Sequence, residues 1–203
     1  MKKKNYINLA KKAANIQIKE LKKINKVFNK SFVKAIDLIL NCKGKVIFAG
    51  VGKSGIIARK ISATFSSVGI PSFFCDPAQA LHGDMGQIEK KDILIIFSYS
   101  GNTSELTNML KYANRSRIKI IGIASKPESI LLKASDIKLL LPKVKESDAT
   151  GMVPTSSTSI SLLLGDCLAT TVISKRKFSK EKFKIFHPGG NIGGSLLLAN
   201  LKK

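Results

Sequence analysis

The apolar residues change their spacing along the chain. Over residues 5–41 they recur at helical intervals, as at Ile36 and Ile39, and no proline interrupts them. This spacing predicts a helical segment. We expect it to bend or divide at Asn25–Lys26 or at Asn29–Lys30. We expect the segment to serve packing, on its own domain or in an oligomer, rather than chemistry.

Beyond this segment, short apolar runs alternate with helical patterns. The run KVIFAG is β-branched, apolar and bounded by glycines, which is typical of a buried strand. Runs that predict strands cover residues 45–50, 72–75, 92–98, 118–124 and 137–141, and helical patterns cover 54–67, 103–114, 128–135, 156–175 and 179–184. A cap for the long helix is expected at Thr155 or Ser156.

This alternation of strand and helix predicts the α/β class. We expect a doubly wound, five-stranded parallel sheet with helices on both faces, a flavodoxin-like three-layer α-β-α arrangement. The predicted organisation is an N-terminal helical segment at 1–41 and one domain at 42–203. No internal repeat is present.

Composition excludes several classes of protein. A chain of 203 residues with 44% apolar residues is too hydrophobic to be disordered, and its core needs no disulfide or metal. Its longest apolar runs, such as 93–97, are too short to span a bilayer, and the start MKKKNYINLAKKAAN lacks the apolar stretch of a secretory signal. Three widely spaced cysteines, without a CxxC pair, favour a reducing compartment, so we expect the cytoplasm.

The formal charge of +22 raises the question whether the protein binds nucleic acid. Basic residues are spread from Lys2 to Lys203, with neither a helix-turn-helix pattern nor a basic stripe interleaved with aromatics. We therefore expect neither a nucleic-acid nor a membrane partner. The positive field would attract a small anionic substrate.

Two loops that follow predicted strands carry candidate chemistry. GVGKSG at 50–55 leads into a helix whose first N–H groups suit an anion, although its spacing is not that of a Walker A loop. SYSGNTSE at 98–105 places four hydroxyls around one glycine at the start of another helix. One hydroxyl suffices to cap a helix, so four favour a phosphate site.

These loops, with VPTSST at 153–158, HPGGNIGGSLL at 187–197 and ALHGDMG at 80–86, come in the order and spacing of sugar isomerase (SIS) domains. The combination resembles the D-arabinose 5-phosphate isomerases, which interconvert D-ribulose 5-phosphate and D-arabinose 5-phosphate. The resemblance runs from about residue 42 to 197. SxSGxT alone would indicate only the wider SIS superfamily.

The resemblance implies which residues form the site. Lys53, Glu105, Glu146 and His187 match the family's catalytic positions. The substrate-binding positions that it implies are Gly52, Ser54, Gly69, Ile70, Asp76, His82, Ser98, Ser100, Gly101, Thr103, Ser156, Ser157 and Thr158. It implies no metal and no cofactor, and a homotetramer with shared active sites, in which His187 comes from a neighbouring subunit.

The sequence departs from the family at three positions. The family usually reads SNSGE where this chain has Tyr99 and Asn102, and often has histidine where Asp76 stands. The histidine position is associated with an inhibitory metal in the family, so its loss argues against metal binding. Long members carry two CBS modules after the SIS domain, whereas this chain resembles the short, SIS-only form.

Aldose–ketose isomerisation needs a base to move a proton between C1 and C2, and a positive group to stabilise the enediolate. We assign the base to Glu146, the charge to Lys53, ring opening or proton shuttling to His187, and orientation or relay to Glu105. By the family's analogy the product feeds Kdo synthesis for lipopolysaccharide or capsule. The alternatives are another SIS isomerase, for a heptulose or hexulose phosphate, and a non-catalytic sugar-phosphate sensor.

Overall fold

The computed structural model describes residues 2–187 and is built around one parallel sheet. The strands are β1 (Val46–Gly50), β2 (Ser72–Phe74), β3 (Ile93–Phe97), β4 (Lys119–Ala124) and β5 (Ile137–Leu140). They lie in the order β2-β1-β3-β4-β5, with every neighbouring pair parallel, which confirms the predicted α/β fold. The direction of winding reverses between β1 and β3, where open parallel sheets form a ligand crevice at their carboxyl edge.

The central strands are buried on both faces. In β1, Phe48 contributes to the core on one face and Ile47 to the core on the other. β3 repeats this pattern, since Ile95 shares the core of Phe48 and Leu94 that of Ile47. The continuous apolar runs of the sequence are therefore the strands covered on both sides.

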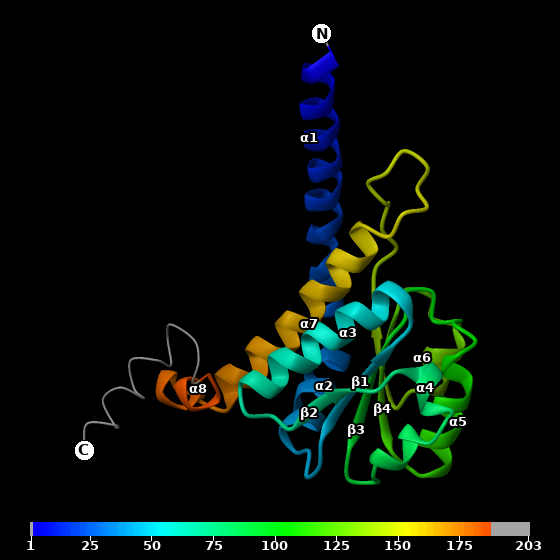
Figure 1. The fold of residues 1–203 in the computed structure, drawn as a ribbon, viewed down its shortest axis with the longest axis vertical. Helices are drawn as coiled ribbons and strands as arrows, with labels where there is room; N and C mark the ends of the chain where they lie inside the picture. Colours follow the sequence, from blue (N-terminus) through cyan, green and yellow to red (C-terminus); the bar gives the residue numbers. More distant parts are fainter. Residues whose placement is uncertain (1, 188–203) are drawn as a thin grey trace.

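Helices form a layer on each face (Figure 1). The first layer contains α2 (Lys30–Leu40), α3 (Gly52–Ser67) and α7 (Ser156–Lys175). The second contains α4 (Pro77–Ala80), α5 (Leu106–Arg115) and α6 (Ile130–Ala134). Gly165 allows α7 to approach α3 closely, because a Cβ there would collide with Ile61.

The N-terminal segment is divided at the second of the two predicted places. α1 (Lys2–Leu21) continues into the 3-10 turn η1 (Lys22–Val27), and α2 begins after Asn29, whose side chain accepts a hydrogen bond from Ser31 N at 2.8 Å. α2 buries Ala35, Ile36 and Ile39 in the core of the domain. α1 projects beyond the body of the domain (Figure 1), with Tyr6, Ile7 and Leu9 exposed.

Two local features differ from the predictions, and a third prediction agrees. The helix expected at 103–114 begins only at Leu106, because residues 98–105 form a loop that is hydrogen-bonded within itself. α4 and the 3-10 turn η2 (Asp84–Gln87) were not predicted; Asp76 caps α4 by accepting from Ala78 N at 2.9 Å. The helix predicted near 179–184 is α8 (Lys180–Phe186).

Among the residues that the structure describes, one helix, α7, is long and apolar enough by length and composition to cross a membrane. In this fold its apolar residues pack against the sheet and α3, as Ile160, Leu164 and Leu168 are fully buried. A helix in the core of a globular protein meets the same criteria, and the packing identifies α7 as such a helix.

Candidate active site

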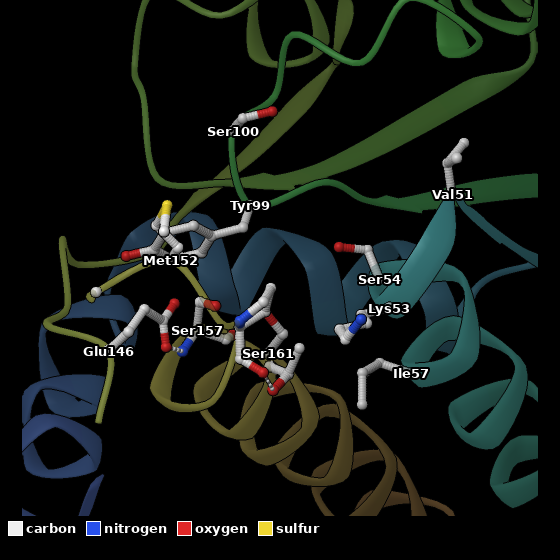
Figure 2. Close-up of a pocket in the computed structure, with 13 residues that line it drawn as sticks. Val51, Lys53, Ser54, Ile57, Tyr99, Ser100, Glu146, Met152, Ser157 and Ser161 are labelled. Atoms are coloured by element: carbon white, nitrogen blue, oxygen red, sulfur yellow. Dashed lines mark hydrogen bonds between the residues drawn. The ribbon is translucent and has the colours of Figure 1, made fainter. Parts of the chain in front are cut away.

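A pocket with a volume of about 450 Å³ lies at the carboxyl ends of β1 and β3. Its lining comes from the first turns of α3 and α7, the loop after β3 and the loop before α7. These residues are Val51, Lys53, Ser54, Ile57, Tyr99, Ser100, Glu146, Gly151, Met152, Pro154, Ser157, Thr158 and Ser161. Figure 2 shows Lys53 and Ser54 on one side of the pocket and Glu146 with Ser157 on the other.

Glycines bring α3 close to the end of β1. A Cβ on Gly55 would collide with the carbonyl oxygen of Gly50, and one on Gly50 would lie 2.9 Å from Phe97 O. The glycines of GVGKSG therefore serve the strand-to-helix turn. The turn directs the amino end of a 16-residue helix, with its unpaired N–H groups and positive dipole end, at the pocket. The exposed ammonium group of Lys53 adds a full positive charge.

Glu146 is fixed by the amino end of α7. Its Oε2 accepts hydrogen bonds from Thr155 N at 2.8 Å, Thr155 Oγ1 at 2.9 Å and Ser157 N at 3.3 Å. The N-cap of α7 is Thr155, one of the two predicted positions. The side chain of Thr155 does not cap the helix; the carboxylate of Glu146 does. Partial burial raises the pKa of Glu146, but hydrogen bonds from Ser157 and Thr155 outweigh this effect, so its pKa lies below the ordinary value of 4.5.

This geometry suits a base. The carboxylate is ionised at neutral pH, held in one position and placed in a pocket that also contains an ammonium group. The pocket therefore combines the amino end of a helix with an ionised carboxylate that is held in place.

The loop after β3 is ordered by its own hydroxyls. Ser98 is buried, its Oγ is 2.8 Å from Thr103 Oγ1, and it accepts from Gly101 N at 3.1 Å. Gly101 has a φ of +70°, and a Cβ there would collide with Ser129 Oγ. Of the hydroxyls predicted to bind phosphate in this loop, Ser100 is the one that lines the pocket.

The departures from the family pattern have structural roles. The Tyr99 hydroxyl donates to Pro142 O at 3.2 Å and accepts from Val144 N at 2.8 Å, which ties the loop after β3 to the loop that carries Glu146. Burial raises the pKa of Tyr99, and the nearby charge of Glu146 adds to this, so the phenol stays protonated. Asn102 binds the start of α6, since its Oδ1 accepts from Ile130 N, the first N–H of the helix, at 3.0 Å.

The structure brings only part of the predicted site together in one subunit. Lys53, Ser54, Ser100, Glu146, Ser157 and Thr158 line the pocket. Gly52 and Asp76 line a smaller cavity of about 110 Å³ on the other side of the same turn, beside Arg59. Ser156 is fully buried under the first turn of α7, where no hydrogen-bond partner of its Oγ is found among the described residues.

Other predicted residues lie outside the pocket. Glu105 is exposed just before α5; its own main-chain N–H and the Ser104 hydroxyl, 2.8 Å away, lower its pKa. His82 is exposed between α4 and η2. Gly69 and Ile70 precede β2, at the opposite edge of the sheet, and Gly69 O accepts from Arg176 Nη1.

His187 directly follows α8 and lies far from the pocket. Its ring stacks on Phe183 with centroids 3.8 Å apart, and its Nδ1 is 2.8 Å from Phe183 O. The pocket is at the amino end of α7, whereas α8 follows its carboxyl end (Figure 1), and a helix of 20 residues spans roughly 30 Å. Residues 188–197 of the predicted HPGG motif are outside the described residues.

The sequence pattern did not reveal most of the pocket's walls. Tyr99 stood out only as a departure from the family, although its place between two predicted site hydroxyls could have marked it. Nothing in the sequence distinguishes Ile57 or Met152 as lining residues, because Ile57 depends on which face of α3 borders the pocket and Met152 on the path of the loop before α7. Within residues 2–187, no three His, Cys, Asp or Glu side chains are grouped as metal ligands.

Comparison with known proteins agrees with the fold and the motifs. The sequence model described as "SIS domain" matches residues 39–171. The chain belongs to the SIS domain family. It is 42% identical over 178 residues to the arabinose 5-phosphate isomerase KdsD of Shigella flexneri, which covers 88% of this chain and 54% of the relative. With the Yersinia pestis KdsD it shares 40% identity over 188 residues, 93% of this chain and 57% of the relative.

The curated relatives are longer than this chain, which matches only a little over half of their length. A solved structure matches more fully. The protein c3406 of E. coli CFT073, solved in complex with arabinose 5-phosphate, superposes with a TM-score of 0.89 and 34% identity, over 93% of this chain and 100% of that one. The predicted family resemblance is therefore confirmed.

Proposed function

We propose that this chain is an arabinose-5-phosphate isomerase, which interconverts D-ribulose 5-phosphate and D-arabinose 5-phosphate through an enediol. The observation that carries the proposal is the placement of an ionised Glu146 opposite Lys53, in a pocket at the amino end of α3. Residues 93 positions apart in the sequence meet there. The similarity to KdsD and to the arabinose 5-phosphate complex of c3406 supports the choice among sugar phosphates.

In the proposed mechanism the phosphate is bound by the amino end of α3, with Ser54 and Ser100 as hydroxyl donors. Glu146 removes the proton from one carbon, C1 or C2, and returns it to the other. The Lys53 ammonium stabilises the oxyanion that develops on the enediolate. Since the pKa of Glu146 is lowered, it is present as the base at neutral pH.

His187 has a place in this mechanism only if a second copy supplies it. In one subunit it is about the length of α7 away from the pocket. We propose a homotetramer in which His187 of a neighbouring copy, which opens the ring or shuttles protons, completes each site. Glu105, His82, Gly69 and Ile70 are assigned to the same assembled site. The exposed apolar residues of α1 support an oligomeric contact.

The proposal extends to the setting of the reaction. The product would enter Kdo synthesis, and the reaction would take place in the cytoplasm, with no metal and no cofactor. This pathway, this location and the absence of a metal and a cofactor are proposed from the similarity to KdsD. The packing of the apolar residues of α7 inside the domain is consistent with a cytoplasmic enzyme.

The central test is an assay with D-ribulose 5-phosphate and, in reverse, D-arabinose 5-phosphate. Wild-type protein should turn over both, and Glu146→Gln should lose about 10²- to 10⁴-fold in kcat while still binding substrate. Glu128→Gln, an exposed carboxylate in the turn before α6 that is not among the pocket residues, is the matched control and should retain full activity. A folded wild-type protein without turnover would refute the proposal. Turnover only of a heptulose or hexulose phosphate would favour another SIS isomerase, and binding without turnover a sensor.

Sharing of the site between subunits has its own test. Glu146→Gln and His187→Ala are each expected to be inactive alone. When the two variants are co-expressed in one assembly, some sites combine an intact Glu146 with an intact His187 from another copy, and activity should return. Mixed assemblies that stay inactive would contradict a shared site.

A further inference from the structure

Hydrogen bonds hold nearly every residue of the loop that carries Glu146. Thr155 Oγ1 accepts from Ser147 N at 2.9 Å, and the Tyr99 hydroxyl contacts Pro142 O and Val144 N as described above. These contacts come from the domain itself. The remaining contacts come from the N-terminal segment, more than a hundred residues away in sequence.

Gln17 joins the loop to α7. Its Nε2 donates to Ser147 Oγ at 3.2 Å, and its Oε1 accepts from Ser159 Oγ at 3.1 Å. Ser147 directly follows Glu146, and Ser159 is in the first turn of the helix that Glu146 caps. The Gln17 amide therefore fixes the distance between the loop that carries Glu146 and the amino end of α7, which binds the Glu146 carboxylate.

Glu20 holds the other side of the same loop. It is 6% exposed, and its Oε2 accepts from Lys145 N at 3.1 Å and is paired with the Lys23 ammonium. Lys23 Nζ also donates to Lys143 O at 3.3 Å. The hydrogen bond from Lys23 lowers the pKa of Glu20 more than burial raises it. The Glu20 carboxylate is therefore ionised at neutral pH.

We propose that Gln17 and Glu20 of α1 are positioning residues for Glu146, which hold Ser147 and Lys145 on either side of it. They touch neither the pocket nor a substrate, and they act through the loop. The inference rests on the proposed function, in which Glu146 is the base. α1 is then part of the catalytic apparatus as well as a packing helix, a role beyond that of its apolar positions.

We expect loss of the Gln17 contacts to change the pH dependence of kcat/KM. A looser loop weakens the hydrogen bonds from Thr155 and Ser157, so the pKa of Glu146 rises towards its ordinary value. The acid limb of the kcat/KM profile reports this group in the free enzyme. Other charged and titratable groups around the loop and the pocket, which the experiment leaves unchanged, are Lys53, Tyr99, Lys145, Asp148, Glu20 and Lys23.

The experiment compares Gln17→Ala with the wild type in the isomerase assay. We expect kcat to fall roughly 10- to 100-fold with little change in KM, and the acid limb to move to higher pH. Lys22→Ala, an exposed neighbour that makes none of these contacts, should match the wild type. An active Gln17→Ala variant with the wild-type kcat and pH profile would overturn the inference, and an inactive wild type would refute the proposed function instead.

A second variant covers the case in which Gln17→Ala does not fold. Ser147→Ala removes the same hydrogen bond from the loop side and leaves α1 intact. It should reproduce the loss of kcat and the pH shift. Where both variants fold, the double variant should lose little more than Gln17→Ala alone, because Ser147 acts through its contact with Gln17, which Gln17→Ala already removes. Fully additive losses in kcat, or a Ser147→Ala variant with the wild-type profile, would overturn the inference.

Discussion

The carboxylate of Asp92 accepts a hydrogen bond from the main-chain N–H of Lys45 at 2.7 Å and joins the beginnings of β1 and β3. Its other oxygen accepts from Glu89 N at 2.8 Å and lies 3.2 Å from Lys45 Nζ, with the side chain fully buried. Gly44 makes room for it, since a Cβ there would collide with Asp92 Oδ1. This contact lies at the amino edge of the sheet, opposite the pocket.

Asp92→Ala should therefore reduce stability without affecting chemistry. It leaves two partly buried N–H groups without their acceptor and leaves the Lys45 ammonium with Glu89 as its remaining carboxylate partner, at a cost of about 2–4 kcal/mol in the free energy of unfolding. Urea denaturation measures the loss. Asp92→Asn keeps one acceptor oxygen and should lose less. Equal losses for the two variants, or a large change in kcat at a temperature where both are folded, would contradict this assignment.

Gly101→Ala should damage the loop after β3 for two reasons. The φ of +70° is unfavourable for alanine, and the new Cβ would collide with Ser129. Gly151 has the same φ of +70° but open space around its Cβ position, so Gly151→Ala isolates the backbone effect, which costs about 1 kcal/mol. Thermal unfolding should show a clearly larger loss for Gly101→Ala. Similar losses would mean that the contact with Ser129 relaxes.

The hydroxyl of Thr155 should affect the pH dependence of turnover. Thr155→Val removes one donor to Glu146 Oε2, so the pKa of Glu146 rises and the acid limb of kcat/KM moves to higher pH. Thr155→Ser keeps the donor and should retain the wild-type profile. An unchanged profile in the valine variant, with activity retained, would show that another group sets the acid limb.

The same carboxylate links stability to pH. Its pKa is lower in the folded protein than the ordinary value of 4.5, so its ionised form contributes stability that is fully present above that value. The contribution is lost as the pH falls below 4.5 and through the folded-state pKa. Glu146→Gln should therefore flatten the decline of the unfolding temperature over this acid range. A decline as steep as that of the wild type would show that the hydrogen bonds to Thr155 and Ser157 do not favour the charged form.

Ser54→Ala should weaken substrate binding more than chemistry. The hydroxyl is on the first turn of α3, in the pocket, where we place the phosphate. Loss of one hydrogen bond to a charged group corresponds to about 1.5–3 kcal/mol, so KM should rise by roughly 10- to 100-fold with kcat nearly unchanged. Steady-state kinetics on the pentose phosphates decides this. A fall in kcat at constant KM would assign Ser54 to the reacting end of the substrate.

The predictable part of this protein is local. The apolar runs at β1 and β3 and the glycines of GVGKSG determine strand, turn and helix through periodicity and backbone freedom, which a sequence displays directly. The error at 103–105 arose because hydroxyls that favour helix caps bond to one another here, as Ser98 and Thr103 do. Their spacing alone does not distinguish the two uses.

The candidate site was predicted unevenly. The two Gly-containing loops stand out by their composition, whereas Glu146 was selected only through the family resemblance. In sequence it is one carboxylate in a polar loop. Its environment is created by Thr155 and Ser157, which reach it because α7 begins beside the loop.

By itself, the amino-acid sequence determined the five strands, the longer helices and the parallel sheet of this protein, and it marked the two candidate phosphate loops, because periodicity, glycine content and capping act between near neighbours. Tertiary structure alone decided that Gln17 and Glu20 hold the loop of Glu146, that Tyr99 is part of the pocket wall, and that His187 lies a helix length from it. These relationships join segments that are distant in the chain, and the packing of α1 against α7, and of α3 and α7 on one face of the sheet, sets their distances.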